Sequence, residues 1–192
     1  MTQRNLAYLG FLGGLFWLGL FLFPPDFGYP GTFAYTYYQW YNRLWTPVLL
    51  LMACGFLAFR QTHHHPETLV IRWAFRVIFL GFGLMMLGNT AEFWFFTTLP
   101  YGEWNMRTFA WLTVLLGALI LLIAAFILGI AWLRSRSQPV WVSVLCLLAL
   151  PLTLVGIFQG FMFLPLAPLT WVMSGLALRP SADSPAELGS TF

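Results

Sequence analysis

The sequence predicts an all-α integral membrane protein, a polytopic bundle of six transmembrane helices with both termini in the cytoplasm. Of its 192 residues, 60% are hydrophobic and only 8% are charged, and the mean hydropathy is +0.79. Soluble domains carry about 25% charged residues, so this composition cannot cover a surface exposed to water. A membrane-crossing helix takes about 20 residues, so six spans fill the chain and leave no room for a soluble domain.

The predicted spans form a single membrane domain over residues 1–179. Charged residues, Pro and Gly interrupt the apolar runs and place the span ends. The approximate spans are 6–23, 44–59, 73–96, 108–133, 140–158 and 164–178. Residues 180–192 are small and polar, so we expect a disordered cytoplasmic tail.

The first span and the segment after it have features that need separate explanation. A basic residue precedes run 6–23, as in a secretory signal, but Pro24 and Pro25 follow it in place of a small-residue cleavage site. We therefore expect a retained helix. Residues 24–43 form the longest predicted loop, and their many Tyr and Trp side chains favour an interfacial belt, with room for a short helix over 32–43. The alternative is an aromatic lid over a binding site.

The last two spans are separated only by a break in an apolar stretch. Residues 140–178 are almost uninterrupted in their apolarity and are too long for one ordinary helix. Gly156, Gly160, Pro165 and Pro168 place a break between about 156 and 168. The final helix is therefore expected to be short.

The arginines predict the orientation, because the chain contains no Lys and cytoplasmic loops of membrane proteins are enriched in basic residues. With the N-terminus inside, only Arg43 and Arg107 lie on the outer side. The inner side then carries Arg4, Arg60, Arg72, Arg76, Arg134, Arg136 and Arg179. This asymmetry supports six spans and a location in the plasma (inner) membrane.

Glu92 is the acidic residue predicted to lie inside the membrane. A buried charge there is costly, so an intramembrane Glu is a candidate functional residue. Gly81, Met85, Gly88 and Glu92 share one helix face, and small residues mark helix contacts, so we expect this face to point into the bundle. The favoured interpretation is a structural ion pair between Glu92 and Arg43 or Arg107. The alternative is an outward-facing ligand site formed by Asn89, Glu92, Asn105, Arg107 and Arg43.

The sequence gives little support to a metal site, a cofactor site or a catalytic site. His63, His64 and His65 are weak metal candidates, because a metal site needs ligands that converge from several positions. No His lies in a predicted span to hold haem, and without Lys no Schiff base can form. We therefore expect no cofactor, no metal and no enzymatic activity. The scattered arginines do not form the basic patch of a nucleic-acid-binding protein.

Two functional hypotheses follow from these features. The favoured one is a non-enzymatic accessory or interaction component of a membrane. Its partners would be the lipid bilayer and other membrane proteins, or a second copy, bound through Gly and Ala helix faces such as Gly10 with Gly14 and Ala125 with Gly129. The alternative is a small transporter or receptor with an outward-facing polar pocket around Glu92.

Overall fold

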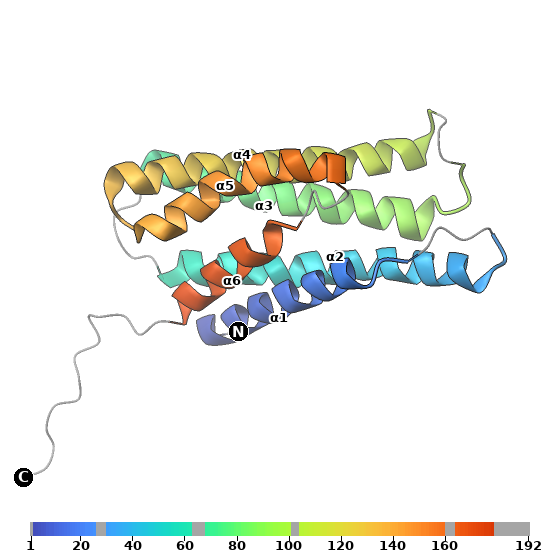
Figure 1. The fold of residues 1–192 in the computed structure, drawn as a ribbon, viewed down its shortest axis with the longest axis horizontal. Coiled ribbons are helices and arrows are strands. Elements are labelled where there is room, and N and C mark those ends of the chain that lie inside the picture. Colours follow the sequence, from blue (N-terminus) through green and yellow to red (C-terminus); the bar gives the residue numbers. More distant parts are fainter. Residues whose placement is uncertain (1, 26–29, 63–67, 101–103, 160–163, 179–192) are drawn as a thin grey trace, which may run out of the picture.

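The computed structural model describes residues 2–25, 30–62, 68–100, 104–159 and 164–178. Within these ranges the chain is helical and contains no strand, which confirms the predicted all-α class. The elements shown in Figure 1 are α1 (Gln3–Leu22), α2 (Phe33–Thr62), α3 (Leu69–Thr90), η1 (Ala91–Phe95), α4 (Met106–Ser135), α5 (Val140–Gln159) and α6 (Leu166–Ala177). His63 to His65 and the predicted tail lie outside the described residues.

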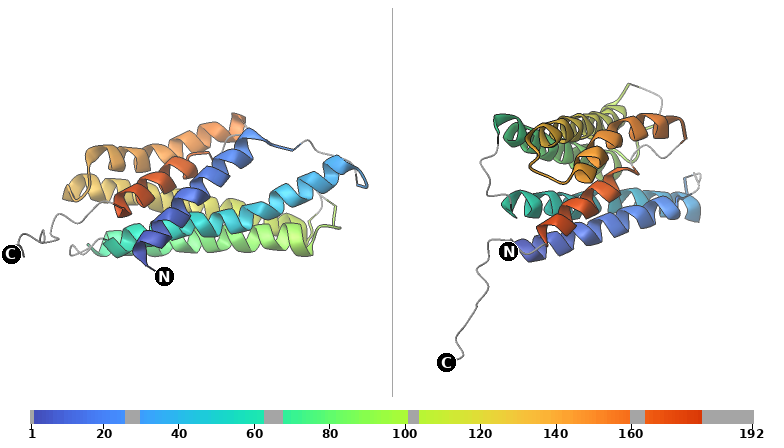
Figure 2. Two further views of the ribbon diagram at one scale, coloured as in Figure 1. Left: turned by 90° about the horizontal axis from the view of Figure 1, so that it is seen from below. Right: turned by 60° about the vertical axis from the view of Figure 1, so that its left-hand side comes forward.

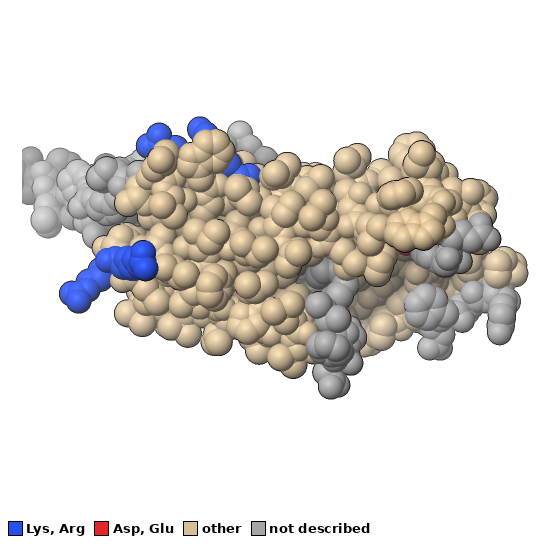
Figure 3. Space-filling model, turned by 90° about the horizontal axis from the view of Figure 1, so that it is seen from above, with Lys and Arg blue, Asp and Glu red and all other residues tan. Residues whose placement is uncertain are grey.

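Four helical segments of the described chain are long and apolar enough to cross a membrane. They are Gln3–Leu22, Phe33–Gln61, Leu69–Phe95 and Met106–Ser135. The apolar parts of the other two helices, Val140–Val155 and Leu166–Ala177, are shorter. Large apolar side chains are exposed along the bundle, and the face in Figure 3 is almost free of charge, with arginine atoms gathered toward its left end. The composition and the long apolar helices therefore indicate a membrane-embedded protein. The six spans and the orientation of the termini stay predictions.

The helices lie in two layers. One layer holds α3, α4 and α5, and the other holds α1, α2 and α6, as Figures 1 and 2 show. Although α6 follows α5 in the chain, it packs mainly against α1 and α2. The layers meet chiefly where α2 packs against α3 and η1.

Glycines bring the helices of each layer into backbone contact. A Cβ atom placed on Gly10 of α1 would lie 2.3 Å from Cα of Gly55 in α2 and 2.5 Å from Oγ of Ser174 in α6. In the other layer, a Cβ atom on Gly81 or on Gly117 would lie 2.7 Å from the carbonyl oxygen of the other glycine. The small-residue faces therefore make contacts within the chain, as small residues do in membrane bundles.

Helix α2 differs from the predicted second span, because it begins at Phe33 and includes most of the expected aromatic loop. The short helix considered over 32–43 is thus present, but it continues without interruption into the span. Thr32 caps it, with Oγ1 accepting a hydrogen bond from Tyr35 N at 3.2 Å. Tyr41 links α2 to α1, because the Tyr41 hydroxyl donates a hydrogen bond to the Leu20 carbonyl oxygen at 2.6 Å. These tertiary contacts place the aromatic residues on a helix.

Candidate functional site

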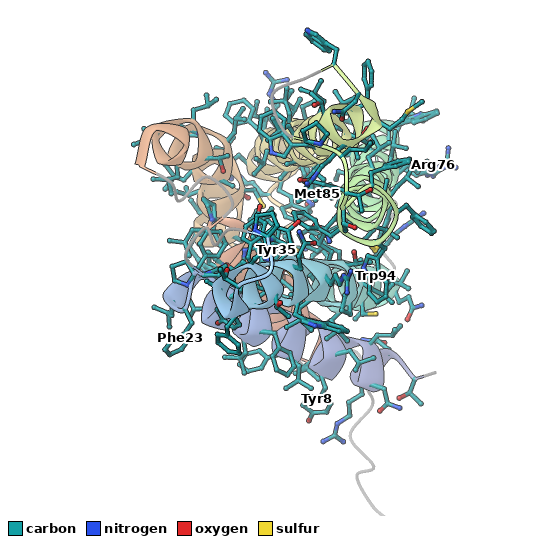
Figure 4. The ribbon with its side chains drawn as sticks, turned by 90° about the vertical axis from the view of Figure 1, so that its right-hand side faces the viewer. Tyr8, Phe23, Tyr35, Arg76, Met85 and Trp94 are labelled. Carbon is teal, nitrogen blue, oxygen red and sulfur yellow. The ribbon has the colours of Figure 1, made fainter. Side chains whose placement is uncertain are left out.

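A pocket of about 680 Å³ lies at the end of the molecule where α2 begins and η1 connects to α4. We call it the end pocket. Figure 4 looks onto this end and shows Tyr35 in the middle, between the two layers. The pocket is lined by Pro30, Tyr35, Gln39, Arg43, Thr97, Thr98, Leu99, Pro100 and Arg107.

One wall of the end pocket is a face of α2. Tyr35, Gln39 and Arg43 are spaced by four residues, which places their side chains on one side of a helix. Gln39 is only 7% exposed, and neither Nε2 nor Oε1 has a hydrogen-bond partner among the described residues. Leaving a buried polar group unsatisfied costs about 1–3 kcal/mol, so native structures rarely keep one without a reason. Gln39 is therefore the residue of this wall that most needs an explanation.

Arg43 is held in position by both layers. Its Nε donates a hydrogen bond to the Phe93 carbonyl oxygen at 2.9 Å. Its guanidinium carbon lies 4.9 Å from the ring centre of Trp40 on α2 and 5.2 Å from that of Trp94 on η1. Arginine stacks well on aromatic rings and presents a rigid set of donors. The two rings therefore orient the guanidinium at the edge of the pocket.

The opposite wall depends on Arg107, which is 3% exposed at the start of α4. Its Nη1 donates to the carbonyl oxygens of Thr97 at 3.1 Å and Leu99 at 2.8 Å. Asn105 also stabilises the segment that connects η1 to α4. Its Oδ1 accepts from Arg107 N at 3.0 Å and its Nδ2 donates to the Pro100 carbonyl oxygen at 2.9 Å. Asn105 thus acts as the N-cap of α4 and as a brace for the pocket wall.

Asn89 is not a lining residue of the end pocket and bonds to α2 nearby. Its Nδ2 donates to the Asn42 carbonyl oxygen and to Thr46 Oγ1, both at 2.9 Å. Thr46 Oγ1 also lies 3.2 Å from Thr90 Oγ1. These bonds join α2 to α3 one turn deeper than Arg43. Asn89 is therefore a structural link in this conformation.

Glu92 is 2% exposed and lies in η1. The hydrogen bond from Phe96 N to the Ala91 carbonyl oxygen, at 2.9 Å, has the i to i+5 pattern of a π-helix, which is frequent at functional sites. Glu92 is buried together with Gly81, Met85 and Gly88, so the prediction that this face points into the bundle is confirmed. The ion pair between Glu92 and Arg43 or Arg107 stays a prediction.

The structure brings together part of the predicted ligand site and adds residues that sequence reasoning missed. Arg43 and Arg107 line the end pocket, whereas Asn89 and Asn105 make structural hydrogen bonds beside it. Gln39 was missed because it was assigned to a loop, where side chains have no fixed direction. Tyr35 belongs to the aromatic segment that the alternative interpretation placed as a lid over a binding site. The available signal was the four-residue spacing from Tyr35 to Gln39 to Arg43.

Within the described ranges, no group of three or more His, Cys, Asp or Glu side chains could hold a metal ion. No protein-family model, curated protein or solved structure shows significant similarity to this chain. Function is therefore inferred from the pocket itself.

Proposed function

We propose that this protein is a membrane receptor or small transporter that binds a small molecule in the end pocket without transforming it. The observation that carries the proposal is Gln39, a buried residue of the pocket lining whose carboxamide donor and acceptor atoms have no partner among the described residues. The pocket volume of about 680 Å³ lies in the range of about 300–1,000 Å³ that is typical of small-molecule sites. Two arginines supply convergent polar groups.

The shape below the pocket supports a binding site more than an open channel. Asn89, which does not line the pocket, ties α3 to α2 with its hydrogen bonds. Deeper in the bundle, Leu49, Met52 and Met85 are fully buried and fill the core between the helices. The site therefore communicates with one side only in this conformation, as expected for a receptor or for one state of a transporter. With the predicted cytoplasmic N-terminus, that side is the outside.

An accessory role in a membrane complex has less support from the geometry. It rests partly on Gly and Ala faces that would bind another helix. Gly10 packs against Gly55, and Gly81 packs against Gly117, so these faces have partners inside the chain. Association with other membrane proteins stays a prediction that needs another surface.

The proposal is tested by thermal unfolding of the purified protein in mild detergent. A panel of small carboxylates, amines and neutral amides is compared on the wild type and on Gln39→Met, which keeps the side-chain length and removes the amide. At least one class should stabilise the wild type, by about 1.4 kcal/mol at ten times its Kd. Gln39→Met should lose most of that stabilisation.

Gln61→Met is the matched control, because Gln61 is an exposed residue near the other end of the same helix. It should respond to the ligand as the wild type does. A panel that leaves the wild-type melting temperature unchanged, or equal stabilisation of Gln39→Met, would overturn the proposal. Uptake of the stabilising compound into proteoliposomes then distinguishes a transporter from a receptor.

A further inference from the structure

We infer, on the basis of the proposed function, that the ligand of the end pocket carries an oxyanion on an apolar body. The oxyanion is a carboxylate or a phosphate and binds between Arg43 and Gln39. Two sources can present this chemistry in a membrane, a small organic acid or the headgroup of an anionic lipid. The experiment below separates them.

The donors of Arg43 support this inference. The hydrogen bond to Phe93 uses Nε, and the guanidinium carbon lies over the rings of Trp40 and Trp94. No hydrogen bond from its two Nη atoms to the described residues is seen. These atoms form the edge that binds carboxylates and phosphates in paired hydrogen bonds. Because the rings and Phe93 already hold the side chain, little ordering entropy is lost when a ligand binds.

Gln39 adds a second polar group at the right spacing. It precedes Arg43 by one helical turn, about 6 Å along the helix axis, and it is a lining residue of the same pocket. Both amide atoms are buried in this conformation, so the Gln39 side chain must turn toward the pocket to bind. Nε2 would then donate to an oxyanion held by Arg43, and Oε1 would accept from a hydroxyl or amide of the ligand. A ligand that binds both residues satisfies the buried carboxamide.

The composition of the remaining wall favours an anion with an apolar body. The lining carries the positive charge of Arg43 at its edge, and none of the described lining residues is acidic. Such a site disfavours a cationic ligand, because like charges repel strongly where water is scarce. The rest of the surface is largely apolar, with Pro30, Tyr35, Leu99 and Pro100. An aromatic or short-chain acid and an anionic lipid headgroup both match this arrangement.

The test uses phenylacetate, its neutral analogue phenylacetamide, and phosphatidylcholine nanodiscs with or without phosphatidylglycerol. Affinity is measured from the shift in melting temperature and from tryptophan fluorescence, since Trp40 and Trp94 flank Arg43. Phenylacetate or phosphatidylglycerol should stabilise the wild type, and phenylacetamide should not. Arg43→Gln should weaken the anion at least roughly tenfold, because hydrogen bonds to charged groups contribute about 1.5–3 kcal/mol.

Arg76→Gln is the matched control. Arg76 also stacks on a tryptophan, with its guanidinium carbon 4.9 Å from the ring centre of Trp73, but it lies on the outer side of α3, away from Tyr35 in Figure 4. Its loss should change the affinity by less than about twofold, as for distant sites. An equal loss in both variants would overturn the inference.

The remaining outcomes assign the failure to one proposal or to both. If phosphatidylglycerol stabilises the protein and phenylacetate does not, the oxyanion belongs to a lipid headgroup and the inference holds. If phenylacetamide binds as tightly as phenylacetate, or if only amines or neutral amides stabilise the protein, the oxyanion inference fails and the ligand-binding function stands. If no compound or lipid of any class stabilises the protein, both proposals fail.

Discussion

The middle of the bundle and its pocket end hold their elements together by different kinds of contact. In the middle, glycines bring backbones together, as Gly10 does with Gly55 and Gly81 with Gly117. At the pocket end, long polar side chains bridge the gaps between elements. Arg43 bonds to η1, and Arg107 bonds to the connection after it.

On the proposed function, this difference separates stability from ligand binding along the length of the bundle. Backbone contact between glycines leaves no space and needs no polar groups, so it suits a region with no water. Bridging side chains hold the helices apart and leave a cavity of about 680 Å³ with hydrogen-bonding walls. Variants in the middle should therefore change stability alone, whereas variants at the pocket end should change stability and binding in ways that depend on the residue.

The largest effect is expected for Arg107→Met, which tests whether bridges at the pocket end stabilise the fold. It removes hydrogen bonds to the Thr97 and Leu99 carbonyl oxygens from a nearly fully buried side chain. Unfolding free energy should fall by about 3 kcal/mol, measured by chemical unfolding in detergent and followed by circular dichroism. Arg134→Met, at an exposed position near the end of the same helix, should stay within about 0.5 kcal/mol of the wild type. Equal effects would show that the bridge does not stabilise the fold.

Gly10→Ala tests the middle of the bundle and should have the next largest effect. The new methyl group would meet Gly55 Cα at 2.3 Å, so α1 and α2 must separate, at a cost of about 2 kcal/mol. Gly19→Ala in the same helix meets no heavy atom within 4 Å and should be neutral or up to about 1 kcal/mol more stable. Both variants should keep the ligand affinity of the wild type. A large loss of affinity in Gly10→Ala would break the proposed separation.

Asn89→Leu should lower stability by about 1.5 kcal/mol, because it removes two hydrogen bonds beside the pocket. Thr90→Val removes only the contact with Thr46 and should cost less, about 0.5 kcal/mol. Unfolding of the two variants under the same conditions gives the comparison. If Asn89→Leu is neutral while binding is lost, Asn89 belongs to the ligand site.

The parts of the structure that follow a helical period were predictable. Gly88 and Glu92 lie in an unambiguous apolar run, so their shared inward face could be derived from spacing alone. Asn105 directly precedes α4, and an Asn before an apolar run is a recognisable N-cap signal. Its role as a cap rather than a ligand could therefore have been anticipated.

The pocket wall was less predictable, since it depends on where α2 begins. The aromatic segment before the second span has the composition of a membrane interface, and only its packing on α1, through Tyr41 and Leu20, shows that it is helical. The pocket that Gln39 lines also needs residues that are distant from it in sequence, Thr97 and Arg107 among them. No local pattern contains that information.

Gln39→Met should have the smallest effect on the free protein and the opposite sign. The variant replaces a buried carboxamide without partners by an apolar side chain of similar length, which should raise the unfolding free energy by about 1 kcal/mol in the absence of ligand. Gln61→Met should stay within about 0.5 kcal/mol of the wild type. A destabilised Gln39→Met would mean that the amide already contributes to the fold. A more stable variant that no longer binds ligand would show that Gln39 serves binding and lowers the stability of the free protein. The glycine contacts in the middle of the bundle would then compensate for that loss.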